Sequence, residues 1–519
     1  MRAPRGVRWA CAAACLVLAG PAAAQRGGRV AEEAAVAGGE AERYLRALQV
    51  AGLAPAHPLS IRALSPRETH RLVPDSGHPW ARPAAAARRS GVRGGLLRPG
   101  AGLAWNSGLP YGFNDGPAWS GRGVTAELRA GLTARAGPVS LRLEPVAFRA
   151  ENRAFTLVST RDTGRLVFAD PRNPRNIDLP QRFGPGAYGR VDPGESTLRL
   201  DLVGVAAGVS TASQQWGPAD AMPLVLGNNG GGFAHAFAGT ASPWRTPLGR
   251  VHGRVVWGWL DQSEYSPMRG HGSRRYATGA VAVWEPRGLS GLEVGGARFF
   301  HLAWPQGGLR GSDLLKVLEG ITKSSVDSTG VGPDGRSSTD NQLASVFARW
   351  VFPRSGMEAY AELAREDHSW DLLDFTLEPD HQAAYTVGVR KVWRGAPGRL
   401  VALRAELQNS QPSHLAAVRK QHPFYRHDNA LQGHTHRGQV LGSPFAYGGG
   451  GSVLGVDAYH PRGRWSAEWV RARVGGGLDG APPEALHALG AEALFFGPGF
   501  DVRAGLTGAG VRDRGPGEV

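Results

Sequence analysis

Cysteine and lysine are almost absent from this sequence, and each shortage excludes a class of protein. The two cysteines, Cys11 and Cys15, both lie at the extreme N-terminus of the 519 residues. Beyond them, a disulfide framework and a zinc site built on thiolates are excluded. The net charge of +15 comes almost wholly from arginines, which are scattered singly along the chain. We therefore expect no nucleic-acid partner, since that would need a basic patch, but attraction to acidic polymers or lipopolysaccharide phosphates.

Long hydrophobic runs are also missing after the N-terminus. A membrane-spanning helix needs about 20 consecutive, mostly apolar residues, so a helical membrane protein is excluded. Residues 1–24 are instead typical of a secretory signal peptide, in which Arg2, Arg5 and Arg8 precede an apolar stretch that ends in small residues. We expect cleavage near Ala24, which would leave an exported chain without any thiol. Export of so long a chain without one disulfide indicates a bacterial envelope protein.

Residues 25–100 differ from the rest and predict a helical N-terminal segment and linker. The sequence supports a helix that begins at about Glu40, with Tyr44, Leu45 and Leu48 on one face. Several prolines follow, and a stretch rich in arginine, alanine and glycine completes the segment as a linker.

From residue 101 to residue 519 the hydrophobic pattern has a period of two, which predicts β-strands. In residues 401–408, for example, apolar side chains alternate with Arg404 and Glu406. A soluble sandwich also gives such alternation, with one face toward water. Here the apolar face includes many alanines and glycines, which fill a sandwich core poorly, and the polar face carries arginine and glutamate as a wet lumen would. The pattern therefore favours a transmembrane β-barrel.

Connections of two lengths support the same interpretation. Tight turns at one end and long loops at the other, with aromatics near the tight turns, are typical of outer-membrane barrels. Short Pro/Gly turns follow aromatic strand ends at Trp284, Phe352, Trp393, Tyr459 and Phe496. Long connections occupy 151–195, 213–230, 261–275, 305–340 and 409–450. We interpret four tryptophans near strand ends as an interface girdle, namely Trp257, Trp284, Trp350 and Trp393.

The predicted fold is all-β, an outer-membrane antiparallel β-barrel of about 18 strands, within the range of porins, with a small N-terminal helical piece. The strand count leaves two defects. One strand is missing between residues 151 and 195, and the last strand, near 500–510, has no descending partner.

A search for catalytic and metal-binding chemistry finds little. Histidines crowd one long loop, where His434 and His436 could offer two imidazoles to a metal, but solvated histidines or sugar contacts are the favoured interpretation. Glu358 and Glu362, or Asp367, Asp371 and Asp374, could form the carboxylate pair of a glycosidase. At strand spacing the two glutamates both face the lumen, where they more plausibly balance Arg390 and Arg404. We expect no enzyme, no metal and no cofactor.

Several motifs carry a resemblance to a known family. They are Ser213–Pro218 (SQQWGP), Pro223–His235 (PLVLGNNGGGFAH), Thr246–Gly249, Val255–Gly258, Leu109–Asp115, Tyr360–Glu362 with Asp367, Gly388, Tyr425–His427 and Gly433–Gly442. The chain resembles the Wzi family of capsule assembly proteins from about residue 40 to residue 475, and the Asn-Asn run is the most specific part.

The resemblance implies an outer-membrane barrel of a Gram-negative bacterium, with a small helical bundle at its periplasmic side. It also implies a surface lectin that helps to hold capsular or exopolysaccharide on the cell. We expect an acidic polysaccharide, since guanidinium groups bind carboxylates strongly, with outer-membrane lipid and lipopolysaccharide as the other partners and a monomeric state. The candidate polysaccharide-binding residues are Trp216, Asn228, Asn229, Phe233, His235 and Arg437.

Two alternatives stay open. If the tight turns are periplasmic, strand parity puts 213–230 outside the cell, where Trp216 could reach the polymer. The same residues could instead only fix a folded loop that closes the barrel mouth. The rival function is a general diffusion porin, which uses the same strands around an open lumen.

Overall fold

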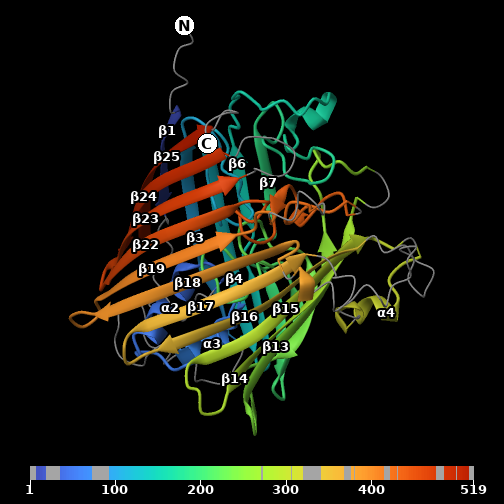
Figure 1. Cartoon of the computed structure of the whole chain (residues 1–519). Helices are drawn as coiled ribbons and strands as arrows, with labels where there is room; N and C mark the ends of the chain where they lie inside the picture. The colour runs from blue at the N-terminus through green and yellow to red at the C-terminus, as the bar shows by residue number, and fades with distance from the viewer. Residues whose placement is uncertain are drawn as a thin grey trace.

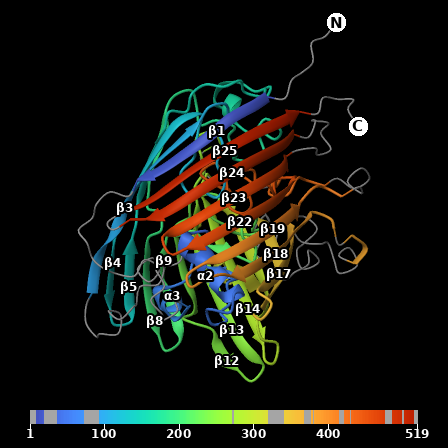
Figure 2. The same ribbon diagram turned by 90° about the vertical axis from the view of Figure 1, so that its left-hand side faces the viewer.

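The computed structural model describes residues 8–18, 36–72, 93–269, 273–305, 307–318, 340–366, 376–378, 380–413, 421–428, 430–474, 484–497 and 500–513. The predicted cleavage site near Ala24, most of the predicted linker and the acidic group Asp367, Asp371 and Asp374 lie outside these residues. Most of the described chain is extended and forms a β-barrel (Figures 1 and 2). Among the described residues, no helix has the length and apolar character needed to cross a membrane.

The first half of the chain contains β1 (Arg8–Leu18), β2 (Ile61–Arg62), β3 (Arg93–Asn106), β4 (Gly123–Ala136), β5 (Val139–Leu143), β6 (Val146–Ala150), β7 (Tyr188–Asp192), β8 (Thr197–Leu202), β9 (Val205–Ser210), β10 (Gln215–Trp216), β11 (His235–Thr240), β12 (Trp244–Thr246) and β13 (Gly249–Leu260). The second half contains β14 (Arg275–Pro286), β15 (Leu292–Ala303), β16 (Asn341–Phe352), β17 (Met357–Glu366), β18 (Ala383–Arg394), β19 (Leu400–Asn409), β20 (Thr435–His436), β21 (Gln439–Val440), β22 (Gly450–His460), β23 (Gly463–Val474), β24 (Glu484–Phe496) and β25 (Asp501–Asp513). The helices are α2 (Glu40–Val50), α3 (Pro66–Leu72) and α4 (Gly311–Leu314), with 3₁₀ turns η2 (Gly164–Phe168) and η3 (Lys316–Leu318).

The strand pairings close into an antiparallel ring. Three positions in the ring each hold a strand that is broken into two pieces. Strands β5 and β6 lie end to end along β4, and they pair with β8 and β7 respectively on their other side. Strands β11 and β12 lie end to end along β13. Counting each broken strand once, the described ring has eighteen positions, which agrees with the predicted fold. The strand missing from the sequence-based count between residues 151 and 195 is β7.

The eighteenth position of the ring is held by the segment that the sequence predicts to be a signal peptide. Strand β1 pairs with β25 on one side and with β3 on the other. It supplies the partner that the sequence-based count could not find for the last strand. Since both pairings are antiparallel, β25 and β3 run parallel to each other. Cleavage of the signal peptide, which stays a prediction, would bring two parallel strands to this seam.

The two faces of the wall differ sharply in polarity. Along β17, Met357 and Leu363 are exposed on the outside, whereas Glu358, Tyr360 and Glu362 are buried inside. Strand β19 likewise exposes Leu403 and Leu407 and buries Arg404 and Glu406. This is the reverse of a soluble protein, in which large apolar patches are rarely exposed. It is the arrangement predicted from the alternation.

The tight turns and the long loops lie at opposite ends of the barrel (Figure 1). Every predicted tight turn joins two neighbouring strands, as between β16 and β17 or between β22 and β23. The predicted long connections are all present, and a further one runs between β17 and β18. The barrel wall begins at Arg93, earlier than the predicted residue 101, because β3 already pairs with β4 from there.

The N-terminal helices lie inside the barrel at the tight-turn end (Figures 1 and 2). Helix α2 begins at the predicted Glu40, and its face of Tyr44, Leu45 and Leu48 is buried. This face packs against inward-facing side chains near the turns, such as Val392 of β18. The predicted helical piece is therefore confirmed as a helix, and it closes the barrel rather than standing beside it.

Long loops enter the barrel from the other end. A buried cluster joins residues 224–226 of one loop and Phe424, Tyr425 and Leu441 of another to the wall residue Phe299. Together with α2, these loops pack the interior beside β13–β19, where Trp216, Phe299 and Tyr425 are fully buried. Toward β4 and β23–β25, the inward-facing Arg129, Glu468 and Arg503 stay 43%, 38% and 37% exposed. The sequence did not indicate whether the lumen is open, and the described residues occupy part of it.

Candidate functional site

The candidate residue Trp216 lies in the interior of the barrel. It belongs to β10, which pairs with β2 of the N-terminal segment so that Trp216 stands opposite Ile61. Its side chain is fully buried and its ring lies 6.2 Å from the ring of Phe299 on the wall. The next residue, Gly217, has φ of +89°, and a side chain there would meet the carboxylate of Glu362. This segment packs inside the barrel, and the ring of Trp216 is not accessible to a ligand outside.

The Asn-Asn pair joins the same plug to other loops. Asn228 donates from Nδ2 to the carbonyl of Asn114 at 3.0 Å, and the carbonyl oxygen of the Asn229 side chain accepts the Asn114 amide at 3.3 Å. Asn229 also donates to the carbonyl of Val440 at 3.3 Å. Three loop segments that are distant in the sequence meet here, and one of them is the Leu109–Asp115 motif, to which Asn114 belongs.

Phe233 and His235 are buried as well, whereas Asn229 and Arg437 keep partial access to solvent. His235 Nδ1 lies 2.7 Å from the carbonyl of Phe233, and the Phe233 ring lies 5.9 Å from that of Phe299. Arg437 is 27% exposed and pairs with Asp192 at 2.8 Å and with Asp261 at 3.0 Å. The structure thus buries four of the six candidates and leaves Asn229 and Arg437 partly exposed. Their role in binding stays a prediction.

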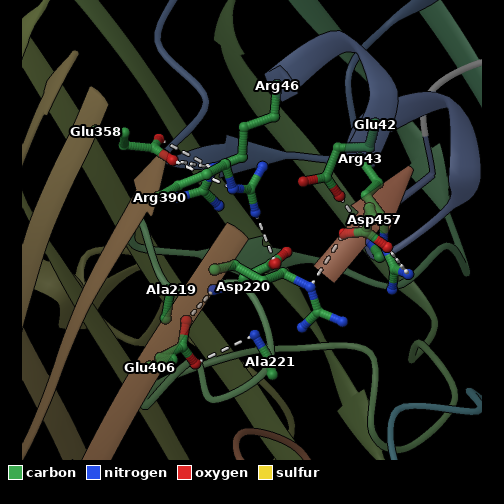
Figure 3. A network of polar contacts seen from close by, with 12 residues as sticks. Glu42, Arg43, Arg46, Ala219, Asp220, Ala221, Glu358, Arg390, Glu406 and Asp457 are labelled. Carbon is green, nitrogen blue, oxygen red and sulfur yellow. Dashed lines mark hydrogen bonds and ion pairs between the residues drawn. The ribbon is translucent and has the colours of Figure 1, made fainter. Parts of the chain in front are cut away.

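A buried charge network connects helix α2, the loop that follows β10 and the barrel wall (Figure 3). Arg46 of α2 donates from Nε to both carboxylate oxygens of Glu358, at 3.0 and 3.1 Å, and from Nη2 to the carbonyl of Pro218 at 2.8 Å. Glu358 is also paired with Arg349, and Arg390 Nε lies 3.6 Å from it. Such charge-assisted contacts are stronger than neutral hydrogen bonds, and they join three parts of the chain.

Glu406 of β19 holds the tip of the same loop. Its carboxylate accepts the backbone N–H groups of Asp220, Ala221 and Met222, at 2.6, 3.2 and 2.6 Å, and the hydroxyl of Tyr360 at 2.6 Å. Asp220 in turn pairs with Arg390 at 2.7 Å. Burial would raise the pKa of Asp220, but the charges of Arg390, Arg46 and Arg404 outweigh it and hold that pKa below its ordinary value. This carboxylate stays ionised as part of the network.

Sequence reasoning did not single out Arg46, Asp220 or Glu406. A usable signal was present, since Glu406 stands between two other inward-facing polar residues of β19, Arg404 and Gln408. Consecutive polar residues on the lumen face of one strand indicate that something polar occupies the lumen there. The sequence of the strand alone does not show which residues occupy the lumen there.

The predicted carboxylate pair does not form a hydrolytic site. Glu358 is bound by arginines as described, which confirms its predicted balance by Arg390. Arg404 pairs instead with Asp457, at 3.2 Å, and with Glu468. The prediction for that arginine was wrong because its carboxylates come from β22 and β23 on one side of β19, whereas Glu358 and Glu362 lie on β17 on the other side. An ion-paired Glu358 has no proton to donate as a glycosidase acid would.

The histidines of the long loop between β19 and β22 are packed rather than solvated. His434 is fully buried, with Nε2 2.6 Å from the carbonyl of Val225, and burial lowers its pKa to about 3. His436 is also buried, and its Nδ1 accepts the N–H of Asp261 at 3.1 Å. Solvated histidines were therefore the wrong expectation for these two residues. Within the described part of the chain, no group of three or more candidate ligands could hold a metal.

Comparison with known proteins gives a likeness in structure alone. A scan against models of protein families finds no match, and no curated protein matches the sequence. Among solved structures, the chain is similar to Wzi of Escherichia coli, described as an outer-membrane protein involved in group 1 capsule assembly and as a carbohydrate-binding β-barrel. The sequences are 14% identical, the TM-score is 0.57, and the match covers 92% of this chain and 99% of Wzi.

Weaker likenesses are to OccK2 of Pseudomonas aeruginosa, with a TM-score of 0.36, 9% identity and coverage of 80% of this chain and 96% of that one. OccAB1 of Acinetobacter baumannii gives a TM-score of 0.35, 7% identity and coverage of 81% and 96%. The fold of this chain is therefore that of Wzi, an outer-membrane β-barrel, and the resemblance to the Wzi family read from the sequence is confirmed at the level of the fold.

Proposed function

We propose that this protein is a non-enzymatic barrel of the outer membrane that binds capsular or exopolysaccharide and helps to attach it to the cell surface. The observation that carries the proposal is a barrel with an apolar outside and a lumen partly occupied by its own charged and aromatic side chains. The exposed apolar wall suits a bilayer, which is the only solvent in which such a face is favourable. The tight-turn end, with helix α2, would face the periplasm and the long loops would face outward.

The occupied lumen supports attachment over transport. A diffusion porin needs a wide water-filled channel, whereas here α2 and the loop network take up much of the lumen from its two ends. Binding is then expected on the outer surface of the loops. Arg46, Arg390 and Arg404 inside the barrel are already paired with carboxylates, whereas arginines on the loops are accessible to an acidic polymer.

The test is a deletion strain of the source bacterium, in which surface-attached and released polysaccharide are measured separately. We expect attached polymer to fall and released polymer to rise, with both restored by the wild-type gene. Unchanged attachment would overturn the proposal. The protein should be recovered with outer-membrane fractions and should migrate differently in gels before and after boiling, as folded barrels do.

A hydrolase is tested in the same material. The chain-length distribution of the released polymer should be identical in the wild-type and deletion strains, and purified protein should leave the polymer uncut. Shortened chains that persist in wild type and disappear in Glu358→Gln would favour an enzyme instead.

A further inference from the structure

Aromatic side chains form a continuous cluster on the loops between β6 and β7 and after β13. The ring of Phe183 stacks on Tyr188, with centroids 4.2 Å apart and planes 17° apart. Trp119 meets Phe183 edge-on at 5.0 Å, and Tyr265 lies 6.2 Å from Phe183 on another side. Phe168, at the end of η2, continues the series at 5.5 Å from Tyr265. We call Trp119, Tyr188, Tyr265 and Phe168, with Phe183 beneath them, the aromatic track.

The track is partly exposed and rigidly supported. Phe183 is buried, whereas the other four rings keep partial access to solvent. Asn152 donates from Nδ2 to the carbonyls of Phe183, Gly184 and Gly186, at 2.9, 3.1 and 2.7 Å. Gly184 has φ of +78°, and a side chain there would collide with the hydroxyl of Tyr265. A surface held in place in this way loses little entropy when it binds a ligand.

An arginine without a carboxylate partner borders the track. Arg165 of η2 donates from Nη1 to the carbonyl of Glu264 at 2.9 Å and to that of Ser266. Its described contacts are to backbone carbonyls, and within the described chain it forms no ion pair with a carboxylate. By contrast, Arg175 on the same loop is paired with Asp162 at 2.7 Å.

We propose that the aromatic track, with Arg165, is the subsite at which this protein holds an acidic saccharide chain. Aromatic rings cover the apolar faces of sugar rings, and the arginine binds the carboxylates of uronate-type residues by charge-assisted hydrogen bonds. The inference rests on the proposed function and names the surface that performs it. Arg437 lies at the edge of the aromatic track. The adjacent Gly438 is so close to Phe183 that a side chain at position 438 would touch the ring.

The binding experiment uses the purified full-length barrel in detergent, with oligogalacturonate as the acidic probe and dextran oligomers as the neutral one. We expect binding of the acidic probe that weakens with added salt, and little binding of dextran. Tyr265→Ala, Phe168→Ala and Arg165→Gln should each weaken binding about tenfold, the size expected for losing a hydrogen bond to a charged group or a packed ring. Tyr265→Phe should bind as wild type does, because the ring is kept.

The matched control is Arg175→Gln, which removes an equal charge from the same loop but one already paired, and it should leave affinity unchanged. Each variant is first checked for the gel shift of a folded barrel. Equal loss in Arg175→Gln and Arg165→Gln, or no binding of oligogalacturonate by the wild-type protein, would overturn the inference. In the deletion strain, a gene that carries both Arg165→Gln and Tyr265→Ala is also tested. Full restoration of attachment by this gene would overturn the inference while leaving the proposed function intact.

Discussion

At the scale of single residues, Arg46 is the contact through which helix α2 is held inside the barrel. Its side chain and that of Glu358 are both fully buried, and its guanidinium also lies over the ring of Tyr360 at 5.0 Å. Arg46→Ala would leave Glu358 paired with Arg349, but it would remove the hydrogen bonds that Arg46 makes to Glu358 and to Pro218. A hydrogen bond to a charged group contributes about 1.5–3 kcal/mol. We expect Arg46→Ala to lower the free energy of unfolding in detergent by that amount, measured by tryptophan fluorescence during urea titration.

The control for this prediction is Arg153→Ala. Arg153 also forms an ion pair, with Glu151 at 2.8 Å, but both side chains are well exposed. Exposed pairs contribute about 0–1 kcal/mol, so the unfolding curve should hardly move. Equal effects of the two substitutions would show that the buried network is not what anchors α2.

Glu40, at the start of α2, predicts a dependence of stability on pH. It lies 2.8 Å from Arg464 and 2.9 Å from Arg503. Burial would raise its pKa, but the charges of Arg464, Arg503 and Arg43 outweigh it and lower the pKa to about 2 from an ordinary 4.5. A carboxyl whose pKa is lower in the folded state stabilises the fold above its unfolded pKa, and that stabilisation is lost as pH falls through the folded value.

We therefore expect wild type to exceed Glu40→Gln in unfolding free energy at pH 7, and the difference to shrink between pH 4.5 and pH 2. Unfolding curves of both proteins at four pH values across this range provide the measurement. The exposed loop substitution Glu264→Gln serves as the comparison and should show no such convergence. A difference that stays constant down to pH 2 would contradict the assigned pKa.

How far single residues could be predicted from the sequence depended on where their partners lie. The faces of α2 and of the strands follow from periodicity, so Tyr44 and Glu358 were placed correctly. For Trp216 the sequence left two roles open, contact with a polymer outside or fixing of a folded loop that closes the barrel mouth, and its buried position agrees with the second. Its actual partners, Ile61 and Phe299, are distant in the sequence, and no local pattern reveals that a loop turns inward.

At the scale of elements, the seam between β25 and β3 carries the next prediction. Ala504 and Leu103 are both paired with Leu16 of β1, and Leu506 and Trp105 with Ala14. Adjacent strands lie about 4.8 Å apart, so an intervening strand holds each pair too far apart for a disulfide. If the predicted cleavage near Ala24 removes β1, the ring must close by bringing these positions together.

We expect the mature protein to begin near Ala24 by mass spectrometry. Cysteines introduced at positions 103 and 504, or at 105 and 506, should then form a disulfide on mild oxidation. The mature chain offers no competing thiol, since Cys11 and Cys15 would leave with the signal peptide. A mature protein that keeps residues 8–18 and forms neither disulfide would show instead that β1 is part of the barrel.

The elements themselves were largely predictable, and the reason is that a barrel strand needs only local information. The period of two and the Pro/Gly turns after aromatic residues set most strand ends, including those of β16 and β22. The alternation of Leu198, Leu200 and Leu202 indicated β8, but β7 was missed because it has only five residues and is separated from β8 by a break at Pro193 and Gly194. The sequence could not predict that the loops turn inward, because contacts between loops set their path.

At the scale of the whole molecule, two obstacles stand in series along one lumen. Helix α2, with its apolar contacts to Val392 and Leu400, narrows the tight-turn end, and the loop held by Glu406 narrows the lumen nearer the other end. Water and ions that cross the barrel meet both, so removing one alone should add little conductance. This separates the proposed attachment role from that of a porin, which conducts without any such change.

We expect the wild-type protein to form no large stable channels in planar bilayers. A variant that lacks residues 36–50 loses α2 but keeps β2, which pairs with β10 of the loop. A variant in which residues 216–227 are replaced by a short Gly/Ser linker loses the loop but keeps the contacts of α2 with the wall. Each should stay close to the wild-type baseline, and only the combined variant should conduct, provided that each shows the gel shift of a folded barrel. Large stable channels in the wild-type protein would favour the porin, because a lumen that conducts at rest cannot be closed by the packing seen at both ends.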